Sequence, residues 1–215
     1  MILITGASGY VGTQFLKKTK RPVRIVSRKN ISQDINSNQD IFTISSLTNN
    51  TDWTGAFEGV DCVLHLAAVV HNNVPSESDP ELYYNMVNNE GTLSLAYSAA
   101  CAGVRRFIYF SSVGVNGTSS DVPLCENSSY NPSDFYSVSK MNAEQGLLLL
   151  AKRYSMEVVI VRPPMVYGPG APGNFQRLVK LLNFNVPLPF GSINNMRSFV
   201  GIQNLIDFIH TCITH

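Results

Sequence analysis

The sequence has few charges, and the two signs balance. Charged residues make up 14% of the 215 positions, with 16 lysines and arginines against 15 aspartates and glutamates, whereas soluble domains average about 25%. Without an excess of one sign, the chain has no sequence-wide attraction for nucleic acid or for an anionic membrane surface. Hydrophobic residues reach 44%, which argues for a folded core and against disorder.

Long apolar runs and paired cysteines are also missing. Apolar runs are short, as at residues 147–151, and a membrane-spanning helix needs about 20 such residues. The first residues carry neither a basic leader nor a small-residue cleavage site, so they do not predict a signal peptide. The cysteines have neither metal half-site spacing nor a disulfide framework; they are Cys62, Cys101, Cys125 and Cys212. We expect a cytoplasmic protein with reduced cysteines, no metal, and no membrane or nucleic-acid partner.

Short apolar runs alternate with longer helical segments along the chain. The runs lack strict alternation, which is typical of strands buried on both faces; they are 2–5, 23–26, 41–44, 62–66, 107–110 and 158–161. The helical segments are 11–20, 52–57, 82–102 and 133–154, and loops are expected at 114–132 and 163–173. This order predicts an α/β fold, a doubly wound parallel sheet (Rossmann-type) with helices on both faces. The tail adds two helical segments around a short strand at 197–201.

A glycine-rich turn follows the first predicted strand. Gly6 permits a tight turn, Gly9 lets the backbone approach a pyrophosphate, and Gly12 allows close packing of helix on strand. The next helix points free N–H groups and its positive dipole end at the same place. A strand before, a helix after and a second strand about 20 residues on are the context of a dinucleotide-binding motif. The alternative is a glycine-rich turn that binds nothing.

The end of the second predicted strand bears on the choice between NAD and NADP. An acidic residue there would bind the ribose 2′-hydroxyl of NAD, but the sequence has Ser27 and Arg28. The planar guanidinium of Arg28 suits a 2′-phosphate. We therefore expect NADP(H) to be preferred over NAD(H). In the alternative, Arg28 stacks on the adenine and the site tolerates NAD.

A tyrosine and a lysine stand four residues apart in a probable helix. Tyr136 and Lys140 therefore share one helical face. A tyrosine with a pKa of about 10 is a poor base at neutral pH, but a neighbouring ammonium favours the phenolate. Such a phenol exchanges a proton with a sugar hydroxyl while hydride moves to or from a nicotinamide. Asn131 or Ser133 is the expected N-cap of this helix.

These features, in this order and spacing, resemble the extended short-chain dehydrogenase/reductase superfamily. The Gly-x-x-Gly-x-x-Gly spacing, a strand that ends in Ser112, and the Tyr136/Lys140 pair carry the resemblance. The most similar group is UDP-glucose 4-epimerase-like and includes reductases of 4-keto UDP-amino sugars. The resemblance implies hydride transfer at C4 of a UDP-hexose or UDP-amino sugar, with Ser112 beside Tyr136 on the reacting oxygen. It also implies an NAD(P)-binding domain with this catalytic set at 1–170 and a partial substrate-binding region at 171–215.

The resemblance assigns further residues by position. The cofactor would contact the three glycines, Ser27, Arg28, Tyr136 and Lys140. It would also contact Ser8, Tyr10, Val11, Leu66, Ala67, Ala68, Pro163 and Val166. Asn174, Arg197 and Ser112 would contact the substrate, with Arg197 on its diphosphate. His65 is expected to be a packed core residue, and Asn88 to have a structural role.

Three departures from the family pattern limit these expectations. Ser45-Ser46-Leu47 replaces the usual Gly-Asp-Leu adenine contact, the acidic cofactor selector is missing, and relatives are longer than this chain. Val113 and Gly114 stand where dehydratases carry a proton-transferring Asp-Glu pair, which disfavours dehydration.

Two activities, epimerase and reductase, stay equally open. The rival is a non-catalytic NAD(P)-binding module or an inactive shortened remnant of the family. The resemblance also implies a homodimer through 82–102 and 141–150, although intramolecular packing explains those apolar stripes as well.

Overall fold

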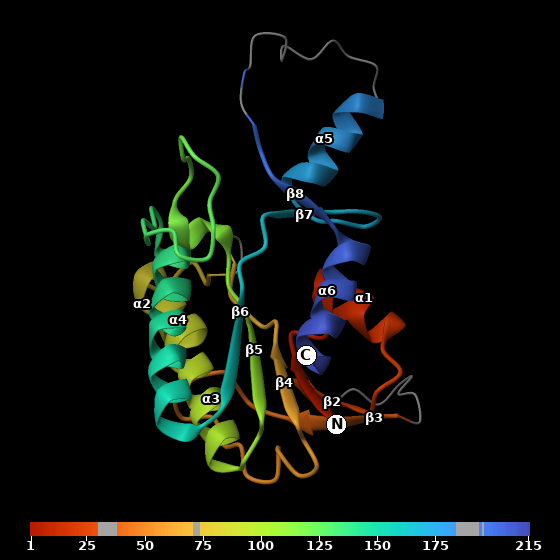
Figure 1. Cartoon of the computed structure of the whole chain (residues 1–215), viewed down its shortest axis with the longest axis vertical. Coiled ribbons are helices and arrows are strands. Elements are labelled where there is room, and N and C mark those ends of the chain that lie inside the picture. Colours follow the sequence, from red (N-terminus) through yellow and green to blue (C-terminus); the bar gives the residue numbers. More distant parts are fainter. Residues whose placement is uncertain (30–37, 71–73, 184–193, 195) are drawn as a thin grey trace.

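The computed structural model describes residues 1–29, 38–70, 74–183, 194 and 196–215 (Figure 1). One parallel sheet forms its centre, with the strand order β3-β2-β1-β4-β5-β6. The predicted doubly wound parallel sheet is confirmed. The strands are β1 (Ile2–Thr5), β2 (Val23–Ser27), β3 (Gln39–Thr43), β4 (Cys62–His65), β5 (Arg106–Phe110) and β6 (Glu157–Val161).

Strand β1 lies at the centre of the sheet and fixes where the chain changes direction. Ile2 pairs with Val23 of β2 on one side and with Cys62 of β4 on the other. The chain builds outward from β1 to β3 and then restarts beyond β1 with β4. The crossover helices therefore diverge between β1 and β4, and the ends of these strands leave a crevice of the kind that binds ligands in open α/β sheets.

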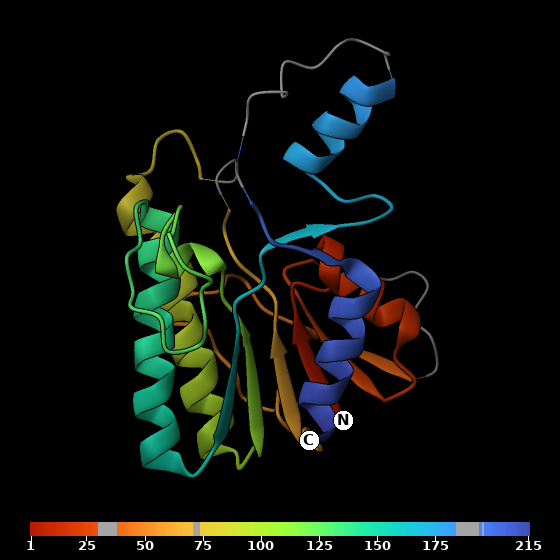
Figure 2. The same cartoon turned by 45° about the horizontal axis from the view of Figure 1, so that its top comes forward.

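Helices cover both faces of the sheet (Figure 2). One layer holds α2 (Pro80–Tyr84), the π-helical η1 (Asn85–Glu90), α3 (Gly91–Cys101) and α4 (Phe135–Tyr154), and the other holds α1 (Tyr10–Lys18) and α6 (Ile202–Thr214). Alternate residues of β1 enter different cores: Leu3 packs with α3 and α4, whereas Ile2 and Ile4 pack with α1 and α6. Among the described residues, none of these helices combines the length and apolarity needed to cross a membrane.

A small second sheet lies beyond the carboxyl ends of the main strands (Figure 1). It pairs β7 (Met165–Tyr167) with β8 (Phe199–Gly201) in parallel, and α5 (Asn174–Asn183) stands between them in the chain. The segment 163–173 was expected to be a loop, which is wrong for β7. Its three residues find their partner more than 30 positions away, and local prolines and glycines give no sign of such pairing. The expected boundary at residue 170, between a cofactor-binding domain and a substrate-binding region, stays a prediction. Helix α6 follows this boundary in the chain but packs against α1 of the first region.

The helix expected at 52–57 is absent, which corrects the sequence interpretation. Residues 54–59 form successive turns, and Gly55 and Gly59 have φ angles of +78° and +70°. These left-handed conformations interrupt any helix. The apolar residues serve packing instead, since Trp53 is buried and its ring lies 6.2 Å from that of Phe42.

The helix expected at 82–102 and the one expected at 133–154 both form, with different starts. Asp79 caps α2 by accepting hydrogen bonds from the N–H groups of Glu81 and Leu82. Asp134 caps α4 by accepting one from the Ser137 N–H at 2.7 Å, so neither Asn131 nor Ser133 is the cap. Any of these short polar side chains suits an N-cap, and the backbone path decides among them.

Candidate active site

Two glycines of the first turn are required by backbone contacts. Gly6 has a φ of +71°, and a Cβ there would lie 2.6 Å from the Ala67 nitrogen. A Cβ on Gly12 would lie 2.4 Å from the Gly6 carbonyl oxygen. The start of α1, the turn after β1 and the turn after β4 therefore touch backbone to backbone, and no side chain fits between them.

The same turn leaves a cradle suited to a diphosphate. Gly9 is the N-cap of α1 without a side-chain hydrogen bond, so no capping side chain satisfies the first-turn N–H groups. Ser8 and Gly9 are exposed. A hollow of about 310 Å³ opens here, lined by Ser8, Gly9, Tyr10, Thr13, Gln14, Pro169, Gly170 and Pro172. Exposed amides at a helix N-terminus fit the pyrophosphate of a dinucleotide.

The other positions expected at the cofactor divide between the turn beside Gly6 and the segments near Ser112 and β7. Leu66, Ala67 and Ala68 follow β4 and are half-buried beside Gly6. The Pro163 carbonyl accepts a hydrogen bond from the Val113 N–H at 3.2 Å, which ties it to the segment after Ser112. Val11 lies in the first turn of α1, and Val166 in β7.

The residues expected to select the cofactor lie at the carboxyl end of β2. The Ser27 hydroxyl donates to the Lys29 carbonyl at 2.8 Å and so closes a local turn. Arg28 is exposed.

Two of the three expected substrate residues come from the segments around the small second sheet. Arg197 is exposed just before β8, and Asn174 begins α5, with its side chain outside what the structure describes.

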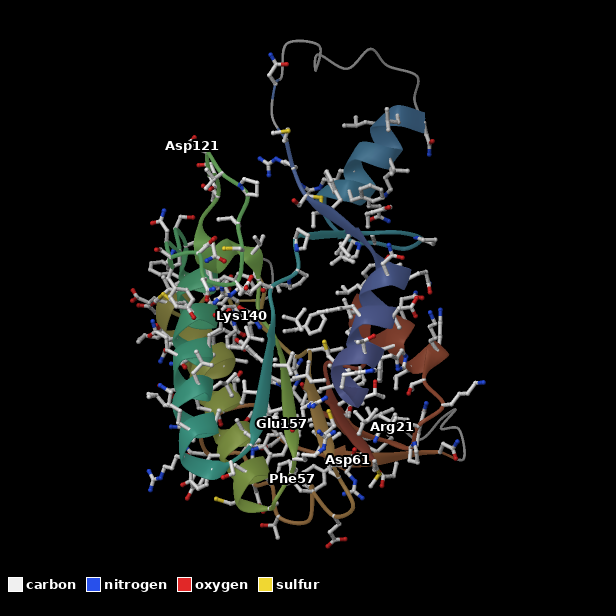
Figure 3. All side chains as sticks on the ribbon, viewed as in Figure 1. Arg21, Phe57, Asp61, Asp121, Lys140 and Glu157 are labelled. Atoms are coloured by element: carbon white, nitrogen blue, oxygen red, sulfur yellow. The ribbon has the colours of Figure 1, made fainter. Side chains whose placement is uncertain are left out.

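The catalytic candidates converge where β5 ends. Ser112 caps the 3-10 helix η2 (Val113–Asn116), and its Oγ accepts from the Gly114 N–H at 3.1 Å. A Cβ on Gly114 would lie 2.7 Å from Ser137 Oγ, so the serine segment packs on the first turn of α4. Lys140 donates to the Phe110 carbonyl at 2.7 Å. Figure 3 shows Lys140 on α4, beside the carboxyl ends of β5 and β6.

Burial governs the charges of this pair. Lys140 is only 2% exposed, and desolvation lowers its pKa to about 7, against the opposing effect of Glu144. Burial also raises the pKa of Tyr136 to about 12, with smaller contributions from Asp134 and Tyr84. The Lys140 Nζ lies 5.9 Å from the Tyr136 ring centroid. The sequence suggested that the Lys140 ammonium would favour the Tyr136 phenolate. In the chain by itself, the effect of burial on the pKa of Tyr136 is larger and favours the neutral phenol.

A buried ion pair braces the catalytic helix. Arg162, just after β6, donates to Glu144 of α4, with Nε 3.0 Å from Oε1. The Tyr130 hydroxyl donates to the other oxygen at 2.8 Å. Glu144 is fully buried, and removing one partner of such a pair would leave an uncompensated buried charge. The pair therefore ties β6, the loop before α4 and the helix together.

A larger hollow, of about 680 Å³, lies at the opposite ends of the strands. It is bordered by the turns at 51–58 and the last turns of α3, and its charged lining residues are Asp52 and Glu58. Phe57, which lines it, is labelled in Figure 3 far from Lys140. Acidic lining disfavours a dinucleotide, so this hollow is a poorer candidate for a cofactor site than the cradle. Within the described ranges, no group of three or more His, Cys, Asp and Glu residues is arranged to hold a metal.

Sequence reasoning missed two residues next to Tyr136. Asp134 caps the helix that carries it, and the helix-start preference for aspartate was an available signal. The Tyr84 ring meets the Tyr136 ring edge-on at 6.1 Å between centroids. No local signal predicts that contact, because α2 and α4 are about 50 residues apart in the chain.

The sequence is similar to that of a known protein family over almost its whole length. The model of the NAD dependent epimerase/dehydratase family matches residues 2–215. The chain belongs to this family. It is 40% identical over 218 residues to the UDP-glucose 4-epimerase of Vibrio cholerae, covering 100% of this chain and 66% of that protein.

Two further relatives agree with the assignment. The N-acetyl-alpha-D-glucosaminyl-diphospho-ditrans,octacis-undecaprenol 4-epimerase of Escherichia coli O157:H7 is 30% identical over 211 residues, with coverages of 97% and 61%. The chain thus spans 61–66% of the length of these two curated relatives. A UDP-glucuronic acid 4-epimerase from Bacillus cereus, solved with UDP-glucuronic acid and NAD, superposes with a TM-score of 0.80 at 25% identity, covering 100% of this chain and 73% of that one.

The depressed pKa of Lys140 predicts a pH-dependent stability. Between pH 7 and about 10 the unfolded chain keeps Lys140 protonated while the folded chain loses the proton, so the free energy of unfolding rises with pH. The rise is at most about 1.4 kcal/mol per pH unit. Urea unfolding at pH 7, 8 and 9 measures it. Lys140→Met should remove the rise, whereas Lys152→Met, on the exposed side of α4, should keep it; equal slopes in both variants would contradict the assignment.

Proposed function

We propose that this protein is an NAD(P)-dependent nucleotide-sugar 4-epimerase that acts by hydride transfer at C4 of a UDP-hexose or UDP-amino sugar. One observation carries the proposal. The glycine cradle follows β1 and Ser112 follows β5, while Lys140, four residues after Tyr136, donates to the Phe110 carbonyl at the end of β5, so all three lie at the carboxyl end of the same parallel sheet. A pure binding module has no use for a buried lysine one helical turn from a half-buried tyrosine at this end of the sheet.

Each residue has a role in this reaction. A bound nicotinamide dinucleotide supplies the hydride acceptor and donor. The Ser112 hydroxyl bonds the C4 oxygen, and Tyr136 as phenolate takes the C4 hydroxyl proton while C4 loses hydride. The keto-sugar would then rotate in the site so that C4 receives hydride on its other face, and Tyr136 would return the proton to the C4 oxygen. Lys140, bonded to the Phe110 carbonyl, places positive charge where the phenolate must form.

Epimerisation is favoured over the related reactions. Val113 and Gly114 follow Ser112 directly and cannot transfer the protons that dehydration needs. The two curated relatives quoted above are 4-epimerases by name, which supports epimerisation over a one-way 4-keto reduction. The UDP-sugar substrate is inferred from the same relatives and from the bound UDP-glucuronic acid of the Bacillus cereus enzyme.

A decisive test removes the phenol hydroxyl alone. Tyr136→Phe should lower the rate of UDP-hexose interconversion, followed by NMR at C4, by at least about 100-fold, since general acid–base groups contribute that much. Cofactor affinity should stay unchanged, because the cradle is intact. Tyr154→Phe, in the last turn of the same helix, is the matched control and should keep full activity. If Tyr136→Phe has no kinetic effect, the non-catalytic NAD(P)-binding module is the better interpretation.

The cofactor preference is a finer proposal that rests on Arg28. Its exposed guanidinium stands at the end of β2, beside the Ser27 turn, where a 2′-phosphate would be received. Arg28→Ala should weaken NADP⁺ binding about tenfold, a loss of about 1.4 kcal/mol, and change NAD⁺ binding less. Titration calorimetry measures both dissociation constants, with Arg153→Ala as a remote control. Tighter binding of NAD⁺ than NADP⁺ by the unaltered protein would refute this preference.

We further propose a homodimer through α3 and α4. Leu82, Tyr97 and Leu149 expose large apolar surfaces on this layer, and an apolar helix pair from a second copy would cover them. Sedimentation equilibrium should give twice the monomer mass, and Leu149→Glu should shift the equilibrium to monomer. Leu182→Glu, an equally exposed leucine on α5, should not. A monomeric unaltered protein would exclude the dimer.

A further inference from the structure

A continuous series of hydrogen bonds runs through the core from the cradle. It begins at the turn under Gly6, where the Ala67 N–H donates to Thr5 Oγ1 at 3.2 Å. Thr5 Oγ1 lies 2.7 Å from Nδ1 of His65. The other ring nitrogen, Nε2, lies 2.8 Å from Thr92 Oγ1 in α3. The imidazole therefore bridges β1 to the helical layer on one face of the sheet.

The series continues to the catalytic helix. Thr92 donates to the Asn88 carbonyl at 2.7 Å. The Asn88 amide donates to Ser139 Oγ at 3.1 Å, and the Ser139 hydroxyl donates to the Tyr136 carbonyl at 2.7 Å. Asn88 also bonds both the N–H and the carbonyl of Val69, at 2.8 and 3.0 Å. The series thus joins the turn that supports the cradle to the helix that carries the phenol.

Burial makes these contacts obligatory. Their side chains are 0–2% exposed, and they belong to Thr5, His65, Asn88, Thr92 and Ser139. A buried polar group that loses its partner keeps its full desolvation cost, so each bond constrains the next. Asn88 enters the series from the π-helical turn η1; such turns are rare in proteins and are frequent at functional sites.

The proton positions follow from counting donors. Thr92 donates its only proton to the Asn88 carbonyl, so its oxygen must accept from a protonated His65 Nε2. In a neutral imidazole Nδ1 is then the acceptor, and the Thr5 hydroxyl donates to it while accepting from the Ala67 N–H. The ring stays neutral because burial, with a smaller effect of Lys140, lowers the pKa of His65 to about 3. The rings of Phe107 and Tyr109 hold it at 5.9 and 5.8 Å between centroids.

We propose that His65 is a positioning residue that couples the cradle to the helix of Tyr136. The hydrogen-bonded series through its ring holds the turn at Ala67 in register with the Tyr136 backbone, in addition to the direct bonds between Asn88 and Val69. The inference rests on the proposed function for its consequence, since register matters only where a cofactor and Tyr136 must meet. The hydrogen-bonded series itself does not depend on that function. Two experiments therefore test the series and its functional consequence separately.

The first experiment tests the series without cofactor. In protein with ¹⁵N-labelled histidine, NMR should show the His65 ring neutral, protonated at Nε2, and without titration between pH 5 and 8. His65→Asn identifies the signals by their loss. Thr92→Val removes the acceptor of Nε2–H and should shift the His65 signals, whereas Thr92→Ser keeps the hydroxyl and should preserve them. An Nδ1-protonated ring, or a ring that titrates in this range, would overturn the series.

The second experiment tests the coupling by a double-mutant cycle. Thr5→Val breaks the cradle end and Ser139→Ala breaks the catalytic end, and these sites do not touch. Independent sites change affinity additively. We expect instead that the dissociation constant for NAD(P)⁺ and kcat each deviate from additivity by about threefold or more, and that the deviation disappears when Thr92→Val is added. All variants are measured well below their melting temperatures, so lost stability alone moves neither quantity.

The outcomes of the cycle are distinct. Additive effects in a protein that binds NAD(P)⁺ and turns over would refute the coupling and leave the proposed function intact. A protein that shows the expected His65 signals but binds no nicotinamide cofactor would refute the proposed function and, with it, the coupling. Non-additive effects that persist with Thr92→Val in place would assign the coupling to another path and overturn the role of His65.

Discussion

Close contact of backbone with backbone at Gly6 is the constraint on which the site depends. A side chain at Gly6 would collide with the turn at Ala67, and one at Gly12 would collide with Gly6 itself. The absence of side chains brings the end of β1, the start of α1 and the end of β4 into one surface. That surface lies at the switch point of the sheet, where helix amides face the same crevice. The cradle is therefore a property of the packing among these three segments.

The same compactness shapes the chemistry at Tyr136 and Lys140. Burial lowers the pKa of Lys140 to about 7 and raises that of Tyr136 to about 12. At pH 7 the phenol is therefore neutral and the lysine is near the midpoint of its titration. A positive charge brought close to Tyr136 would lower the pKa of the phenol, and the buried Arg162–Glu144 pair fixes α4, which carries both groups, against the end of β6.

Features that depend on neighbours in the chain were predictable, and features that depend on distant partners were not. The parallel sheet and the glycine turn follow from apolar runs and local glycine spacing. The helix expected at 52–57 fails because Gly55 and Gly59 adopt left-handed conformations and Trp53 is drawn into the core. β7 exists only because β8 pairs with it. The partners of His65 lie 60 and 27 residues away, so the sequence indicated a core histidine without indicating what it joins.

Two exposed arginines lie beyond the carboxyl ends of the strands. At the carboxyl ends, Arg28 follows β2 and Arg197 precedes β8, and both are exposed. At the amino ends, the larger hollow carries Asp52 and Glu58. The pairing of β7 with β8 brings the Arg197 segment beyond the same strand ends as the cradle, although almost 200 residues separate them. The proposed reaction needs this segment, the cradle, Lys140 and Tyr136 at one end of the sheet, and the parallel direction of all the strands is what places them there.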